Sequence, residues 1–218
     1  MTLTSVEQLV ELLADSHTYS YVEFLGPETG DNSPIGNTIE LFCFGNYQQY
    51  LTYRDQYIEL PLQCEIKLVK LSVIALFNDL DGSSTGIPVS DILSHPQYGI
   101  GSGLQAIGIG FEEFIMDMID DGLVEAQIDD TDLVSLRSVQ LRDAYSSDMY
   151  ELRVLDEHGD IPTRSVKYAI ENIRDWYTNK LIPLQKQLST TKSTGDSPQL
   201  VGDNKENTRK RKTPDHIT

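Results

Sequence analysis

Residues 111–141, FEEFIMDMIDDGLVEAQIDDTDLVSLRSVQL, change from one apolar period to another halfway along. Their first part has large apolar residues at helical spacing, followed by a glycine suited to ending a helix: Phe111, Phe114, Ile115, Met118 and Gly122. The next apolar residues alternate with polar ones, which predicts a strand containing Val124, Ala126 and Ile128. After an acidic turn at 129–132 the alternation resumes at Val139 and Leu141. This stretch therefore predicts a helix followed by a β-hairpin.

Two further helices are predicted upstream. Residues 62–80, LQCEIKLVKLSVIALFNDL, follow Pro61 and place apolar residues at helical spacing. A short helix over 89–94 is flanked by prolines. We interpret the glycine-rich residues 99–103 as a turn, with the third helix over 104–121. Three helices followed by a hairpin is the element order of a winged helix, which fits residues 62–155.

The first 61 residues are predicted to be helical. An apolar stripe over 6–13 follows Thr4, and Glu7 lies three residues after Thr4, which is the spacing of a capping box. Residues 26–37 are dense in Gly, Pro, Asn and Asp, which predicts a loop. Residues 38–53 predict two short helices with a tight turn between them, and strands are the alternative. The expected fold class is therefore mainly α with a small β-hairpin.

Residues 162–188 predict one helix roughly 40 Å long, which Pro183 should kink or divide. Residues 150–155 are expected to add a third strand before it. The apolar stripe of the helix either packs back on its own domain or stays exposed and docks into a helical bundle of other chains. That stripe comprises Val166, Ile170, Ile173, Trp176, Tyr177, Leu181, Leu184 and Leu188.

Residues 189–218 lack aromatic residues and predict a disordered tail. The tail contains a basic cluster before Thr213-Pro214, which is typical of a nuclear-import signal: Arg209, Lys210, Arg211 and Lys212. We find no apolar run of about 20 residues and no basic leader, so we expect an intracellular protein of the nucleus and cytoplasm. The two cysteines, Cys43 and Cys64, are expected to be buried reduced thiols.

The charge of the chain is unevenly distributed. Of its 218 residues, 34 are acidic and 17 basic, but residues 189–218 alone have a net charge of +2, so residues 1–188 carry −19. A winged-helix nucleic-acid binder, the alternative function, would place residues 104–121 in the major groove. That segment contains no Lys or Arg and five acidic residues: Glu112, Glu113, Asp117, Asp120 and Asp121. Because phosphates repel such a surface, the charge favours protein partners.

No pattern in the sequence indicates an enzyme. None of the four histidines lies at a metal-ligand spacing from another, and the carboxylates at 129–132 fail the calcium-loop pattern because the required Gly and Glu are missing. Gly101-x-Gly103-x-x-Ala106 has dinucleotide-fingerprint spacing, but no apolar strand precedes it. We therefore expect no catalytic, metal or cofactor site.

Three segments resemble one protein family. The pattern LxxxIKLVKLSV at 62–73 resembles the first winged-helix helix in COP9 signalosome subunit seven. ELFCFGN at 40–46 and IRDW at 173–176 are similar to segments of the small fungal subunit nine. The resemblance covers roughly residues 1–188 and is to the PCI-domain subunits of the COP9 signalosome. PCI subunits of the proteasome lid or a translation initiation complex are the alternative.

The resemblance implies a PCI domain with a helical part at 1–61, a winged-helix part at 62–155 and a C-terminal helix at 162–188, followed by the tail at 189–218. It implies a non-catalytic scaffold whose partners are other PCI and MPN subunits, with no small-molecule substrate. The complex removes Nedd8 from cullins, and another subunit performs that reaction. The hairpin residues Val124, Ala126, Ile128, Val139 and Leu141 would then serve lateral association, while bundle contacts would come from Ile173, Trp176, Tyr177, Leu181, Leu184 and Leu188.

Overall fold

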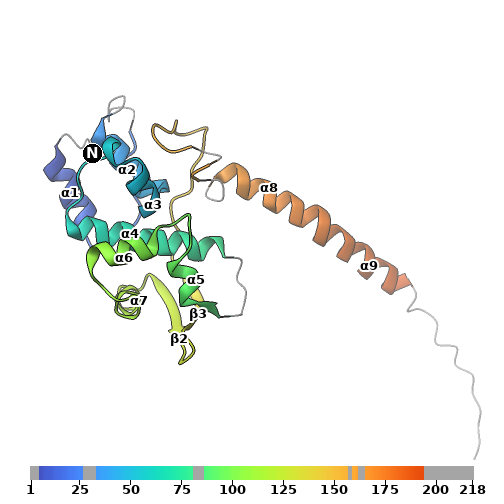
Figure 1. The fold of residues 1–218 in the computed structure, drawn as a ribbon. Coiled ribbons are helices and arrows are strands. Elements are labelled where there is room, and N and C mark those ends of the chain that lie inside the picture. The colour runs from blue at the N-terminus through green and yellow to red at the C-terminus, as the bar shows by residue number, and fades with distance from the viewer. Residues whose placement is uncertain (1–4, 27–32, 81–85, 157–158, 162–164, 194–218) are drawn as a thin grey trace, which may run out of the picture. The chain divides into compact units, whose positions relative to one another are not determined.

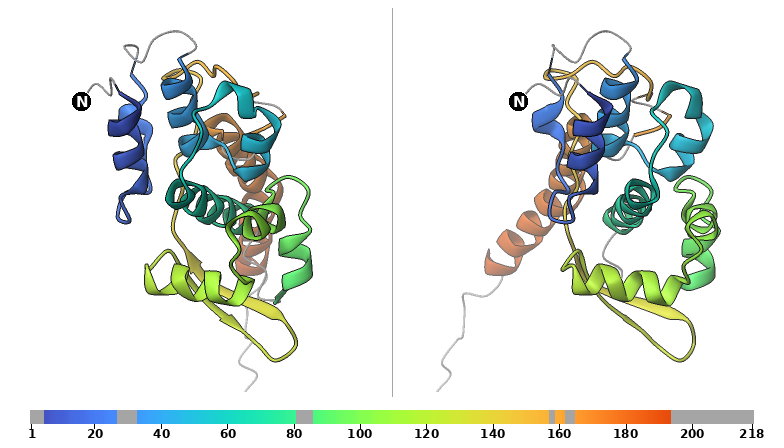
Figure 2. Two further views of the ribbon diagram at one scale, coloured as in Figure 1. Left: turned by 60° about the vertical axis from the view of Figure 1, so that its left-hand side comes forward. Right: turned by 90° about the vertical axis from the view of Figure 1, so that its left-hand side faces the viewer.

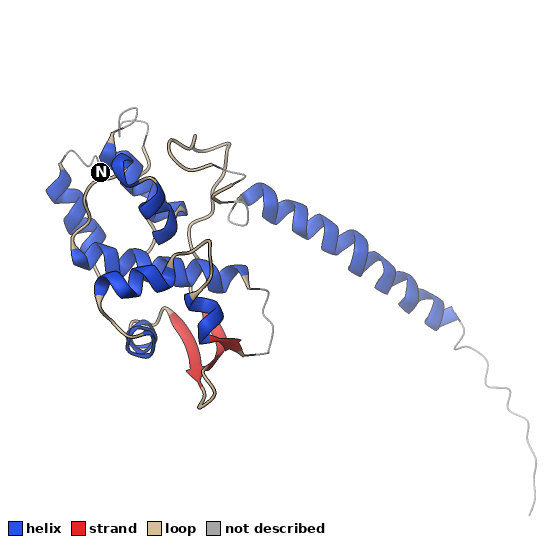
Figure 3. Cartoon of the chain, in the orientation of Figure 1, coloured by secondary structure: helices blue, strands red, loops and turns tan. Residues whose placement is uncertain are grey.

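The structure is a computed structural model that describes residues 5–26, 33–80, 86–156, 159–161 and 165–193. Within these residues the chain is mainly helical and contains a small antiparallel sheet of three strands (Figure 3). This agrees with the predicted fold class. The chain divides into two compact units, Met1–Ile173 and Arg174–Thr218.

The N-terminal helices begin at hydroxyl caps. Helix α1 (Val6–Ala14) starts after Ser5, whose side chain accepts a hydrogen bond from the Gln8 amide, so Ser5 rather than the expected Thr4 is its cap. Helix α2 (Pro34–Phe44) starts after Ser33, which accepts from the Gly36 amide. The predicted loop at 26–37 is therefore too long. Its last residues form the first turn of α2, because a serine cap followed by proline favours a helix start.

A tight turn separates α2 from α3 (Tyr47–Thr52), so the prediction of two short helices at 38–53 is confirmed and the strand alternative is wrong. Asn46 caps α3 by accepting from the Gln49 amide, and the Gln49 side chain accepts from the Asn46 amide in return. Gly45 fits this turn because a Cβ there would lie 2.9 Å from the Leu41 carbonyl oxygen.

Helix α4 (Leu62–Asp79) confirms the helix predicted at 62–80 and runs through the middle of the first unit (Figures 1 and 2). Helices α1, α3 and α6 and strand β3 all pack against it. Twelve of its eighteen residues are buried, including Lys67 and Lys70. Helix α4 is therefore the central core element of the first unit.

The glycine-rich segment is helical, contrary to the prediction of a turn at 99–103 and one helix over 104–121. Helices α5 (Val89–Leu93), α6 (Ile100–Ile107) and α7 (Phe111–Asp120) occupy this region. A Cβ at Gly103 would lie 2.5 Å from a Val69 methyl group, so glycine permits close packing of α6 on α4. The helix break comes later, at Gly108, whose φ is +74°.

The predicted hairpin is confirmed: β2 (Val124–Ile128) pairs antiparallel with β3 (Leu133–Val139), and Leu141 lies beyond the strand. The third strand is β1 (Ile87–Pro88), which gives the strand order β1-β3-β2. The strand expected at 150–155 is wrong, because those residues have no regular structure. A two-residue strand that contains proline is too short to show an alternating pattern.

The C-terminal helix consists of α8 (Val166–Trp176), a π-helical turn (Tyr177–Leu181) and α9 (Ile182–Ser193). The Ile182 amide bonds to the Tyr177 carbonyl, and Pro183, which has no amide hydrogen, follows at once. The expected division near Pro183 thus takes the form of a π turn. The helix continues five residues past the predicted end at Leu188, so the predicted tail starts too early. Residues 162–164 and 194–218 lie outside the described residues.

Candidate protein-interaction surfaces

Helix α8 exposes a row of apolar side chains. Val166, Ile170, Ile173 and Tyr177 follow each other at spacings of four, three and four, which places them on one side of a helix. Ile173 is 66% exposed and Trp176 52%, and no residue of α8 is buried. Aromatic and branched side chains exposed in a continuous row are typical of a surface that binds another protein.

The second unit carries the rest of the predicted bundle residues. Tyr177, Leu184 and Leu188 are each at least half exposed, while Leu181 is half-buried. Their spacing of four, three and four with Leu181 included matches that of an amphipathic helix. The structure therefore brings all six predicted bundle residues onto one run of helix.

The hairpin residues are less uniform. Val124 is buried in the core, and Ala126, Ile128 and Val139 are half-buried. Leu141 is 83% exposed, but it lies outside the strands. Among the described strands β2 is at the edge of the sheet, so the backbone of β2 rather than the Val124 side chain is what a partner would reach.

A long irregular segment, which the sequence did not indicate, crosses from the hairpin back to the N-terminal helices. We name residues 140–156 and 159–161 the strap. Asp143 accepts hydrogen bonds from the Ser20 hydroxyl and the Tyr21 and Val22 amides, at 2.6, 2.7 and 3.2 Å. Arg142 donates to the Phe42 carbonyl at 2.8 Å, near the end of α2 where carbonyls lack helical partners.

The middle of the strap meets a buried carboxylate. Glu40 of α2 is fully buried, and its oxygens accept from the Tyr150 hydroxyl and from the Arg153, Val154 and Leu155 amides, at 2.7 to 3.0 Å. These amides belong to the residues that were expected to form a strand. Their hydrogen bonds thus go to a side chain more than one hundred positions away instead of to a sheet.

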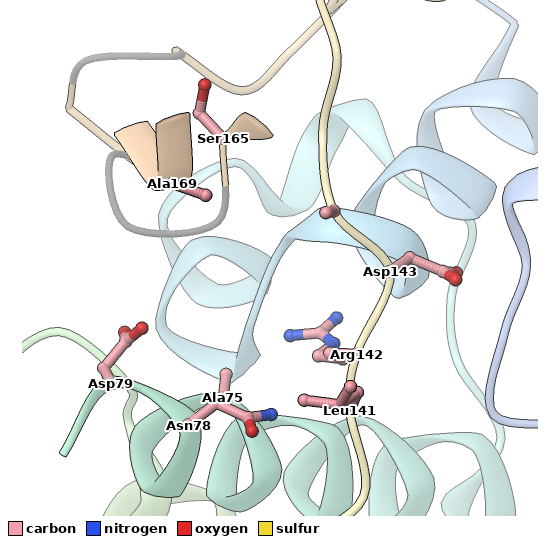
Figure 4. Close-up of a pocket in the computed structure, with 9 residues that line it drawn as sticks. Ala75, Asn78, Asp79, Leu141, Arg142, Asp143, Ser165 and Ala169 are labelled. Carbon is pink, nitrogen blue, oxygen red and sulfur yellow. The ribbon is translucent and has the colours of Figure 1, made fainter. Parts of the chain in front are cut away.

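A cavity of about 200 Å³ lies beside the strap, where α4 approaches the start of α8 (Figure 4). Figure 4 shows Arg142 and Asp143 projecting to opposite sides of the chain. The cavity wall is mostly apolar and includes three alanines: Ala75, Ala144 and Ala169. The lining also contains polar and charged residues: Asn78, Asp79, Arg142, Asp143 and Ser165.

Two buried lysines of α4 bond to residues of other elements in the first unit. Lys70 forms ion pairs with Asp117 and Asp121, and although burial opposes its charge, these two hydrogen bonds raise its pKa. Lys67 donates to the Asp15 carbonyl, and its Nζ lies 4.6 Å from the centre of the Tyr19 ring. Burial lowers the pKa of Lys67 to about 8.

The outer face of α7 is acidic. Glu112, Glu113 and Asp120 are exposed there, and Asp117 keeps a side-chain exposure of 60% beside Lys70. The helix that would enter a major groove thus presents negative charge. This surface opposes contact with a phosphate backbone.

Several acidic and thiol side chains have structural roles. Among the described residues no three His, Cys, Asp or Glu side chains lie close enough together to hold a metal ion. Asp129 accepts from the Thr131 and Leu133 amides and so stabilises the hairpin turn. Cys43 and Cys64 are buried free thiols, as predicted, and burial raises the pKa of Cys43.

The nuclear-import signal and membrane-spanning helices can be assessed only within the described residues. The candidate nuclear-import residues 209–212 lie outside it. No helix in the described ranges is both long and apolar enough to cross a membrane. In comparisons with known proteins, no protein-family description matches the chain, and no curated protein matches it significantly.

Proposed function

We propose that this protein is a non-catalytic scaffold subunit of the PCI type, a component of the COP9 signalosome. The observation that carries the proposal is the exposed apolar row on the C-terminal helix, with Trp176 at 52% and Ile173 at 66% exposure. A helix that leaves such side chains in water is suited to bury them against helices of partner chains. In this role the protein supports the removal of Nedd8 from cullins and thereby regulates cullin-RING ubiquitin ligases.

The arrangement of the first unit supports the same proposal. Helix α4 is followed by β1, by α5 to α7 and then by the β2-β3 hairpin, and β3 lies between β1 and β2. Four helices precede the hairpin instead of the three expected, but a helical segment followed by a hairpin is in keeping with a winged helix, with α1 to α3 as the helical part before it. The family resemblance in the sequence implies a winged helix at this place, and it adds the lateral association through the hairpin edge.

The charge of α7 argues for protein partners over nucleic acid. Glu112, Glu113 and Asp120 are exposed on the helix that a nucleic-acid binder would insert into the groove. Phosphates repel such a surface, most strongly at low ionic strength. In the proposed complex the cleavage of Nedd8 belongs to another subunit, and this chain supplies contacts only.

The test is purification of the tagged full chain from its native cell, with mass spectrometry of its partners and a cullin Nedd8 blot after deletion of its gene. We expect PCI and MPN subunits of the signalosome and an accumulation of Nedd8-modified cullin. If proteasome-lid or initiation-factor subunits are recovered and the cullins are normal, the protein would be assigned to that complex instead of the signalosome. The absence of stable partners would contradict the scaffold function.

Two variants test the surface itself. Trp176→Ala should reduce retention of the partners strongly, because aromatic anchors dominate such interfaces. Glu112→Ala, which removes an exposed acidic side chain from α7, should leave retention unchanged. Equal retention of both variants would rule out the C-terminal helix as the assembly surface.

A further inference from the structure

The Glu40 carboxylate is the centre of an unusual polar site inside the first unit. It has no solvent exposure, yet it is held by four hydrogen bonds from the strap. Three of the donors are consecutive backbone amides, which together form an anion-binding nest of the kind that phosphates and carboxylates occupy. A buried carboxylate is tolerated only with such a complete set of donors.

The fourth donor is adapted to this task. Burial and the nearby Glu40 carboxylate raise the pKa of Tyr150, so its hydroxyl keeps its proton and remains a donor. One side chain thus accepts from the Tyr150 hydroxyl and from the amides of residues 153–155. Loss of the carboxylate would remove the acceptor of all four donors at once.

Phe44, one helical turn after Glu40, holds a second point of the strap. Its ring lies 5.6 Å from the Tyr145 ring in an edge-on arrangement and 6.2 Å from the Tyr150 ring. Residues four apart lie on the same face of a helix, so one face of α2 fixes the strap at both Tyr145 and Tyr150.

Tyr145 links this face of α2 to the start of the C-terminal helix. Its carbonyl accepts a hydrogen bond from the Val166 amide at 2.7 Å, and it forms a parallel bridge with Ser165. Ser165 is buried, and its carbonyl in turn accepts from the Ala169 amide in the first turn of α8. Among the described residues, the strap thus connects α2 to the start of α8.

We propose that Glu40 is the latch that fixes the beginning of the C-terminal helix to the N-terminal helices. With the carboxylate in its nest, Tyr145 stays against Phe44 and holds Val166. When the carboxylate is lost, the strap leaves α2 and the first turn of α8 loses its anchor. The latch is a property of the isolated chain, and it holds whichever complex the protein joins.

The test is hydrogen exchange of the full chain, compared between wild type, Glu40→Gln and the control Glu59→Gln. Glutamine keeps the shape of Glu40 but puts an NH2 group against amide donors. We expect residues 150–156 and the Val166 amide to exchange about tenfold faster or more in Glu40→Gln, with α4 unchanged. Glu59 is exposed, so its variant should exchange like wild type.

Two results would overturn the proposal. In one, residues 150–156 exchange faster while Val166 keeps its protection, which would mean that the nest does not anchor α8. In the other, nothing changes in Glu40→Gln. Because the experiment contains no partner protein, its failure would leave the scaffold function standing, and failure of that function would leave the latch standing.

A second variant covers the case in which Glu40→Gln unfolds the whole chain and α4 loses protection as well. Tyr150→Phe removes one of the four donors and leaves the carboxylate with its three amides. We expect the same local pattern with a smaller rate increase, several-fold at residues 150–156 and Val166. Unchanged exchange in Tyr150→Phe would then refute the latch.

Discussion

Helices α2 and α8 have the same length of eleven residues and opposite surroundings. Nine residues of α2 are buried, including a glutamate, whereas no residue of α8 is buried although it contains valine, isoleucine, tyrosine and tryptophan. The contacts of α2 lie within this chain and explain its sequence. The apolar side chains of α8 are not buried by the described residues, and we propose that a partner covers them.

The largest expected difference between the two helices concerns their glutamates. Glu40→Ala in α2 removes the acceptor of four hydrogen bonds and should lower the free energy of unfolding by about 3 to 5 kcal/mol. Glu171→Ala in α8 alters an exposed side chain and should change it by less than about 0.5 kcal/mol. Urea unfolding followed by circular dichroism measures both, and similar losses would contradict the contrast.

Substitution of a leucine should affect stability in α2 and partner binding in the C-terminal helix. Leu41→Ala, at a fully buried position of α2, should cost about 2 to 4 kcal/mol of stability because it leaves a cavity. Leu184→Ala in α9, where the side chain is 53% exposed, should leave stability unchanged and weaken partner binding by about tenfold. Thermal unfolding and titration with the partner complex check the two effects. A Leu184 variant that unfolds more easily but binds normally would reverse the assignment.

Buried Lys67 in α4 and exposed Lys167 in α8 should differ in how they make the free energy of unfolding depend on pH. The folded pKa of Lys67, about 8, lies below the ordinary lysine value of 10.5, so the unfolded chain binds more protons between these values. Lys67 should therefore raise the free energy of unfolding as the pH rises above 8, by up to about 3 kcal/mol in total. Ionisation of Cys43 and Cys64 in the unfolded chain lowers stability over the same pH range in every variant, because burial raises the pKa of both thiols in the folded chain. The contribution of Lys67 is therefore the difference in unfolding free energy between wild type and Lys67→Met, which should grow in favour of wild type between pH 8 and 10.

The matched control is Lys167→Met in α8, where the lysine is exposed. This variant should keep the pH dependence of the wild type. Measurements should stop near pH 10, because burial raises the pKa of Tyr19 to about 12 and ionisation of unfolded tyrosine lowers stability above that pH. A rise that persists in Lys67→Met would assign it to another group.

The smallest expected effect concerns the start of α2. Ser33→Ala removes the side chain that accepts from the Gly36 amide and should cost about 1 kcal/mol. The melting temperature of the full chain reports this loss, and Ser33→Asp should restore it because aspartate also caps helices. If aspartate fails to restore stability, the role of Ser33 is other than capping.

The sequence predicts those parts of the fold whose signal is local. Helix α4 and the β2-β3 hairpin show clear periods of 3.6 and 2 over many residues, so both predictions are confirmed. The apolar residues of the C-terminal helix were also found by their spacing, although the spacing left open whether they pack on their own domain or stay exposed. Glycines misled the prediction of α6, because Gly101 and Gly103 allow close packing inside a helix as readily as they form turns.

The strap could not be predicted because its contacts are distant in sequence. Asp143 bonds to residues 20–22, and Glu40 to residues 150–155, with more than one hundred residues between the partners. Such polar pairs have no periodic pattern, and a glutamate in a helix is usually taken for a surface residue. The local signal was misleading, since Tyr150, Leu152 and Val154 alternate with polar residues as they would in a strand.

Trp176 allows the most direct test, since it is the only tryptophan of the chain. The full chain carrying fluorotryptophan would be studied by fluorine NMR, alone and after assembly with the purified partner subunits. We predict a signal that responds to solvent isotope exchange in the free chain and loses this response in the complex. A tryptophan that is shielded in the free chain, or equally exposed in both states, would contradict the assignment of the C-terminal helix as the assembly surface.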